Sequence, residues 1–105
     1  MKIIKIKNQK QYKKIVEQHL FGQIKIKNLT FKFGEILHKK LKLERTYETE
    51  KALLIKLFHD NKPLYSSWFP KSQIKIEKKK FTIPFWMVKK ITQGFEPFVF
   101  SLEIE

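Results

Sequence analysis

The sequence of 105 residues contains no cysteine, three glycines, four prolines and a single arginine among its 23 basic residues. The absence of cysteine excludes disulfides, thiolate metal sites and a cysteine nucleophile, and it is typical of proteins in a reducing cytosol. With so few glycines and prolines and no serine- or glutamine-rich tract, we expect no linker and no disordered arm. Because a chain of this length can bury one core by itself, residues 1–105 are predicted to form a single domain.

Long apolar runs are missing too. No stretch approaches the roughly 18 apolar residues that a membrane-spanning helix requires. The first seven residues alternate apolar and basic side chains, whereas a signal peptide has a continuous apolar centre. The sequence therefore predicts a cytoplasmic protein without a membrane partner.

The usual motifs of catalysis and cofactor binding are absent from the sequence. The glycines lie far apart, so no glycine-rich phosphate-binding loop is present, and His19, His38 and His59 lack metal-ligand spacing. A nuclease-like pattern of Asp60 with Glu77-Lys78 is weak, because Asp60 lies in a turn sequence and acid–lysine pairs arise by chance in a lysine-rich chain. We expect no enzymatic activity, no metal and no cofactor.

Positive charge is what the sequence has in excess. The 23 basic residues oppose 10 acidic ones, which gives a formal net charge of +13. All basic residues lie within residues 1–90, whereas residues 91–105 hold three acids and no base. AT-rich coding inflates lysine in many proteins, but glutamate usually rises with it, and here it does not. The charge therefore favours a polyanionic partner.

Hydrophobic periodicity predicts an α+β domain. An alternating strand opens the chain, and Asn8 offers the N-cap of an amphipathic helix over residues 9–21 that Gly22 ends. Period-two alternation then predicts strands over residues 24–33, 41–47, 65–69, 74–76, 81–83 and 98–104. The alternation changes parity at Asn28, which indicates a turn or bulge. Residues 52–58 are more continuously apolar and are expected to be covered on both faces.

Turn residues and one short helix complete this expectation. Asp60-Asn61-Lys62-Pro63 is typical of a turn, and Lys78-Lys79-Lys80 of a hairpin tip. Pro84 suits the first turn of a short helix that closes near Gly94. The predicted fold has an N-terminal βα unit, a mostly antiparallel sheet able to curl into a small OB- or SH3-like barrel, one short C-terminal helix and a closing strand.

Three motifs resemble a pattern in small uncharacterised proteins of bacteriophages and mobile elements. They are Glu48-Thr49-Glu50-Lys51-Ala52-Leu53-Leu54, Trp68-Phe69-Pro70-Lys71-Ser72-Gln73, and Ile83-Pro84-Phe85-Trp86 followed by Lys89-Lys90. The resemblance covers about residues 48–90 and implies a phage or mobile-element origin, in the company of replication, recombination or counter-defence proteins. This chain departs from the pattern after Glu77, where three lysines replace the commoner Gly- or Asn-containing turn.

The lysines between residues 71 and 90 form the main candidate site, with an ordinary solvated face as the alternative. Trp68 precedes a proline that ends its strand, and it is either a core anchor or a platform for base stacking with Lys71 beside it. Trp86 is expected to be a core anchor. The candidate nucleic-acid-binding residues are Trp68, Lys71, Lys75, Lys78, Lys79, Lys80, Lys89 and Lys90. A second patch would combine Lys5, Lys7, Lys25, Lys27 and Lys32.

The leading functional hypothesis is a non-enzymatic protein that binds single-stranded nucleic acid or structured RNA, mainly through phosphates. A single arginine and no evident recognition helix argue against sequence-specific reading of a duplex. The alternative is a protein-interaction module, such as a phage-encoded inhibitor or a subunit of a nucleoprotein complex. In that case the C-terminal strand, residues 95–105, would pair with a sheet edge of the partner.

Overall fold

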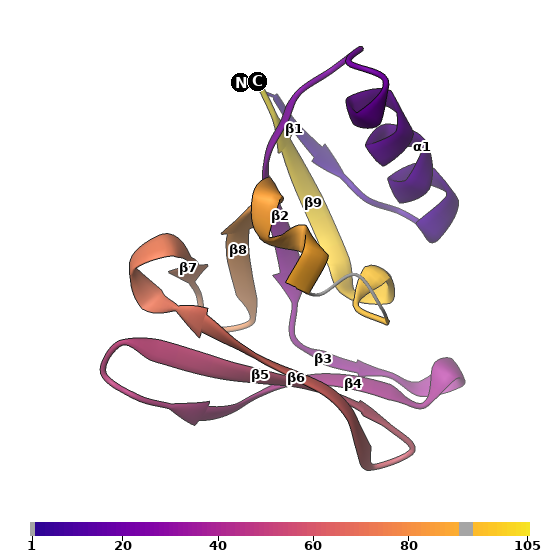
Figure 1. Ribbon diagram of the computed structural model, residues 1–105. Coiled ribbons are helices and arrows are strands. Elements are labelled where there is room, and N and C mark those ends of the chain that lie inside the picture. The colour runs from indigo at the N-terminus through magenta and orange to yellow at the C-terminus, as the bar shows by residue number, and fades with distance from the viewer. Residues whose placement is uncertain (1, 91–93) are drawn as a thin grey trace.

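The computed structural model describes residues 2–90 and 94–105, although the side chains of Lys89 and Lys90 lie outside the described part. These residues form one α-helix and nine strands in two antiparallel sheets (Figure 1). The predicted α+β class, with its N-terminal βα unit and its antiparallel sheet, is therefore confirmed.

The five-stranded sheet brings together strands from both ends of the chain. Its order is β1 (Lys2–Lys5), β9 (Val99–Ile104), β2 (Ile26–Lys32), β8 (Lys80–Pro84) and β7 (Lys75–Ile76). The first and last strands pair directly, with Lys2 opposite Ile104, so the two ends of the chain lie side by side (Figure 1).

The four-stranded sheet is a sequential meander. Its strands are β3 (Gly34–Ile36), β4 (Leu41–Glu48), β5 (Ala52–His59) and β6 (Lys62–Pro70). The chain passes from β2 into β3 through Gly34, whose φ of +132° is strained for any residue with a side chain. Asp60 and Asn61 both have positive φ, as the tight turn of the β5–β6 hairpin requires.

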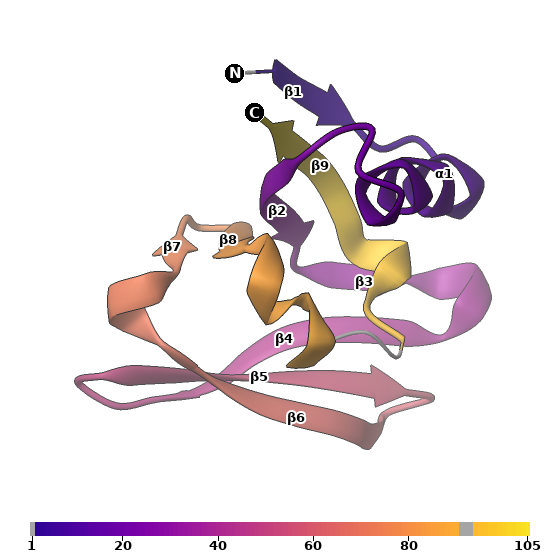
Figure 2. The same ribbon diagram turned by 45° about the horizontal axis from the view of Figure 1, so that its top comes forward.

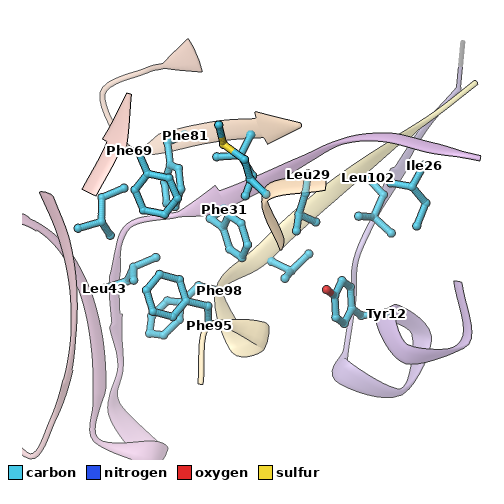
Figure 3. Packing of buried hydrophobic residues seen from close by; sticks show 14 of the residues in the cluster. Tyr12, Ile26, Leu29, Phe31, Leu43, Phe69, Phe81, Phe95, Phe98 and Leu102 are labelled. Carbon is cyan, nitrogen blue, oxygen red and sulfur yellow. The ribbon is translucent and has the colours of Figure 1, made fainter. Parts of the chain in front are cut away.

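The helix α1 (Gln9–Leu20) has the predicted caps. The Asn8 side chain accepts a hydrogen bond from the backbone N–H of Gln11 at 2.8 Å. After the helix, Gly22 has a φ of +76° and its N–H donates to the carbonyl of His19 at 3.1 Å. Tyr12 and Ile15 are buried, so α1 packs on the core side of the five-stranded sheet, and Figure 3 shows the Tyr12 side chain in the same core as Leu29.

Aromatic residues join the two sheets. Phe31 of β2 stacks on Phe81 of β8 with ring centroids 5.0 Å apart, and Phe69 of β6 contacts Phe81 at 5.8 Å. Figure 3 shows these rings facing one another between the sheets. The inward positions of both sheets are thus apolar and form one shared core.

Short 3-10 helices fill the connections. They are η1 (Leu37–Lys39), η2 (Lys71–Gln73), η3 (Phe85–Lys90) and η4 (Glu96–Phe98). Figure 2 shows η3 between the two sheets, where Met87 is buried. Within the described ranges, no helix is long and apolar enough to cross a bilayer.

Two sequence expectations need correction, and a third is not confirmed. The short C-terminal helix is a 3-10 helix, and Pro84 is the last residue of β8 rather than part of its first turn. In β5 only alternate side chains are buried, so one face of this central strand is not covered by another layer. The strands that the structure describes form two sheets and are not closed into a barrel, so an OB- or SH3-like barrel stays a prediction.

Other local expectations are confirmed at some residues and differ at others, because β6 already begins at Lys62 and Lys80 belongs to β8 rather than to the hairpin tip. The register of β2 against β9 shifts between Ile26 and Asn28, where the alternation changes parity. Strand β6 ends at Pro70, and β7 and β8 form a hairpin whose tip carries Lys78 and Lys79.

Candidate nucleic-acid interface

The outward face of the five-stranded sheet carries a row of residues that crosses all its strands. The strand registers place Lys75 opposite Thr82, Thr82 opposite Thr30, Thr30 opposite Ser101, and Ser101 opposite Lys5. Because neighbouring strands lie about 4.8 Å apart, the two lysines at the ends are separated by roughly 19 Å across the sheet. The row therefore places a cation at each edge and hydroxyl groups between them.

A second row extends this positive surface. Lys80 pairs with Lys32 on the neighbouring strand. The Lys80 ammonium lies 4.0 Å from the ring centroid of Phe100, and the Lys5 ammonium lies 5.9 Å from the same ring. Such a contact holds the lysine side chain in place without neutralising its charge.

Two exposed lysines, Lys78 and Lys79, occupy the tip of the β7–β8 hairpin. The tip is held by a hydrogen bond from the N–H of Glu77 to the carbonyl of Lys80 and by another from the N–H of Phe33 to the carbonyl of Lys79, both 2.8 Å. We call this surface the basic face, which comprises Lys5, Lys32, Lys75, Lys78, Lys79 and Lys80.

The structure divides the second lysine patch that the sequence predicts. Lys5 and Lys32 join the basic face through strand pairing. Lys25 instead pairs with Glu105 at 3.6 Å, and Lys7 lies in the connection to α1. Lys27 lies at the bulge of β2, where the register shifts. The sequence shows that these lysines lie on alternating positions, but it does not show which strand each one faces.

Lys71 is engaged in an ion pair. Its ammonium lies 3.0 Å from a carboxylate oxygen of Glu48, and its backbone N–H donates to the carbonyl of Lys51 at 2.8 Å. The hydrogen bond from Lys71 lowers the pKa of the Glu48 carboxyl, and nearby Arg45 lowers it further. Lys71 thus ties η2 to the β4–β5 hairpin, and Glu48 competes with any phosphate for its charge.

Trp68 points away from the core on the four-stranded sheet. It is 44% exposed, whereas the adjacent Phe69 is fully buried. Its ring meets that of Tyr47 edge-to-face, with centroids 6.0 Å apart. Trp68 is therefore not a core anchor, and the two sheets with their core separate it from the basic face.

Trp86 also differs from the expectation of a core anchor. It is 65% exposed on η3, whereas the next residue, Met87, is buried. The backbones of Lys89 and Lys90 end η3, but their side chains lie outside the described residues, so the prediction that they bind nucleic acid stays untested.

The C-terminal strand β9 lies inside the sheet, between β1 and β2. Both of its backbone edges already pair with neighbouring strands. Strand addition to a partner by this segment is therefore ruled out, because no backbone edge is left to pair. Its outward side chains, Ser101 and Glu103, lie on the same face of the sheet as the lysines of the basic face.

A polar groove of about 600 Å³ runs over this same face. The outward residues of the strands form one side of it, and the segment from η2 to β7 forms the other. Its lining includes Thr30, Thr82 and Ser101 of the central row, and Ser72 and Gln73 of the Trp-x-Pro-Lys-Ser-Gln motif. The hydroxyl residues were not among the predicted site residues, although their outward parity on predicted strands was a usable signal.

The described residues contain no group of three or more His, Asp or Glu side chains able to hold a metal ion. Asp60 lies in the β5–β6 turn and Glu77 at the β7–β8 tip, at the ends of hairpins in different sheets. No protein-family model, curated protein or solved structure matches the chain, so the resemblance to phage and mobile-element proteins stays a prediction.

Proposed function

We propose that this protein is a non-enzymatic nucleic-acid-binding domain that holds the phosphate backbone on its basic face. The observation that carries the proposal is the convergence of lysines distant in sequence, from Lys5 to Lys80, on one outward sheet face. A sheet face with cations and hydroxyls suits an extended sugar–phosphate chain, because phosphate oxygens accept hydrogen bonds from both groups.

Single-stranded nucleic acid or structured RNA is the preferred ligand class. The described part of the chain has one α-helix, and its Tyr12 and Ile15 pack on the core side of the five-stranded sheet, so the helix lies on the side opposite the basic face. Lysine, unlike arginine, contacts phosphate as a point charge and gives little reading of base sequence. The base-stacking role of Trp68 remains a separate prediction, since its ring lies on the other sheet.

A pair of charge-matched variants tests the proposal. Lys78→Glu/Lys79→Glu inverts the exposed hairpin tip, whereas Lys13→Glu/Lys14→Glu inverts two exposed lysines on α1, on the opposite side of the five-stranded sheet. Lys80 is left unchanged because it is half-buried over Phe100. Both variants lose the same charge, so any difference between them reports position rather than net charge.

Binding of labelled single-stranded DNA, single-stranded RNA and duplex DNA is measured by fluorescence anisotropy. We expect the hairpin variant to bind at least about tenfold more weakly than the α1 variant. If most lysines of the basic face neutralise a phosphate, wild-type affinity falls by about two to three orders of magnitude between roughly 50 and 200 mM salt. Equal losses in the two variants, or no salt dependence, would contradict the proposal.

A further inference from the structure

The groove on the basic face has an unexpected charge. Two of its lining residues, Glu77 and Glu103, are acidic, and Lys75 is the lysine that lines it. Even in a protein of net charge +13, these two carboxylates make the part of the groove around them a poor phosphate site. The groove instead suits groups that donate hydrogen bonds.

Glu103 is the most precisely held of these carboxylates. The side-chain amide of Asn28 donates to one Glu103 oxygen at 2.6 Å, and the two residues are paired across β2 and β9. A carboxylate offers about four lone-pair positions, so this one contact leaves both oxygens able to accept further hydrogen bonds. The carboxylate is thus fixed in direction while still lining the open groove.

We infer that the groove takes an unpaired base that presents two adjacent donors, which is the Watson–Crick edge of guanine. Its N1–H and N2–H groups match a carboxylate, whereas uracil and thymine offer one donor on this edge. Adenine and cytosine place a ring acceptor beside their amino group, and a carboxylate repels it. The inference rests on the proposed function, because the basic face has to hold the neighbouring phosphates.

The dimensions of the groove agree with this ligand. A volume of about 600 Å³ lies within the range of about 300–1,000 Å³ that is usual for small-ligand sites. Lys75 lies three strands from Glu103, or roughly 14 Å at normal strand spacing, so it is placed for a phosphate rather than for the same base. A paired guanine has no free Watson–Crick edge, so the groove selects single strands.

The test uses oligothymidylate single strands that differ at one central position, which is guanine, inosine, adenine or thymine. The wild-type protein should bind the guanine strand at least about fivefold more tightly than the all-thymine strand. Inosine lacks the N2 amino group and should be intermediate. Anisotropy titrations at one salt concentration measure these ratios.

Glu103→Gln should abolish the guanine preference, because its amide presents a donor to the donors of guanine while its oxygen still accepts from Asn28. Glu105→Gln is the matched control. It removes the same charge two residues further along the chain, from a side chain that pairs with Lys25. The control should keep the preference. Equal guanine preference in both variants would overturn the inference.

Failure of the inference is distinguishable from failure of the proposed function. A wild-type protein that binds every strand equally, while the hairpin variant Lys78→Glu/Lys79→Glu loses binding, overturns the guanine site alone. The inosine comparison uses the wild-type protein, so it decides the question even if Glu103→Gln folds poorly. If the hairpin variant binds every strand like the wild type, the proposed function fails as well.

Discussion

At the scale of single residues, Tyr12 shows how burial changes the chemistry of a side chain. It lies on the buried side of α1 and is 9% exposed. Burial raises the pKa of its hydroxyl to about 12, and the negative charge of Glu96 adds to the effect. Because the folded protein keeps a proton that the unfolded chain loses, this residue opposes folding only in alkaline solution.

We predict that Tyr12→Phe removes this loss of folding stability at alkaline pH. The contribution of Tyr12 to stability is constant below pH 10 and decreases as the pH rises towards 12. The free energy of unfolding of the wild type minus that of the variant should be about 1 kcal/mol smaller at pH 11 than at pH 8. Urea unfolding of both proteins at the two pH values measures this change. A difference between them that is the same at both pH values would contradict it.

At the scale of secondary-structure elements, α1 depends on its N-terminal hydrogen bonds. Asn8 accepts from the N–H of Gln11, and the Gln11 side chain accepts from the N–H of Lys7 at 2.7 Å. The first turn of α1 has no acidic side chain to interact with the helix dipole. The cap at Asn8 is therefore expected to matter more than in a helix with an acidic first turn.

Asn8→Ala should lower the free energy of unfolding by about 1 kcal/mol, because it leaves the N–H of Gln11 without its acceptor. Asn8→Ser keeps an oxygen at the cap position and should cost less than half as much. Urea denaturation monitored by circular dichroism compares the three proteins. The cap has no such role if the alanine and serine variants are equally stable.

At the scale of the whole molecule, the net charge of +13 opposes folding through self-repulsion. Among the described residues, the ion pairs of Lys42 and Lys71 that offset this repulsion lie on the four-stranded sheet and η2. The lysines of the basic face remain close to one another across the other sheet. Screening by salt should therefore stabilise the fold.

We predict that the melting temperature rises when NaCl increases from about 20 to about 500 mM, by roughly 4–8 °C if screening contributes about 1 kcal/mol. The quadruple variant with glutamate at positions 13, 14, 78 and 79 loses eight units of charge and should respond less. Differential scanning calorimetry at the two salt concentrations compares the proteins. A rise of equal size in both would contradict an electrostatic origin.

The chain itself determines the features that arise from near neighbours. The N-cap at Asn8, the positive-φ turn at Asp60-Asn61 and the bulge near Asn28 each depend on residues within a few positions, so they were predictable from local chemistry and alternation. The position of Lys78 and Lys79 at the tip of a hairpin was also predictable from the local sequence. These lysines were recognised because hairpin tips expose their side chains.

Only the tertiary structure decides which distant residues share a face. Strand order places β9 between β1 and β2, which removes it as a pairing edge and brings Lys5 into one row with Lys75. It also places Trp68 on the other sheet from these lysines. Alternation tells how side chains point from a strand, but strand order is chosen by the burial of the whole core, and no local pattern contains that choice.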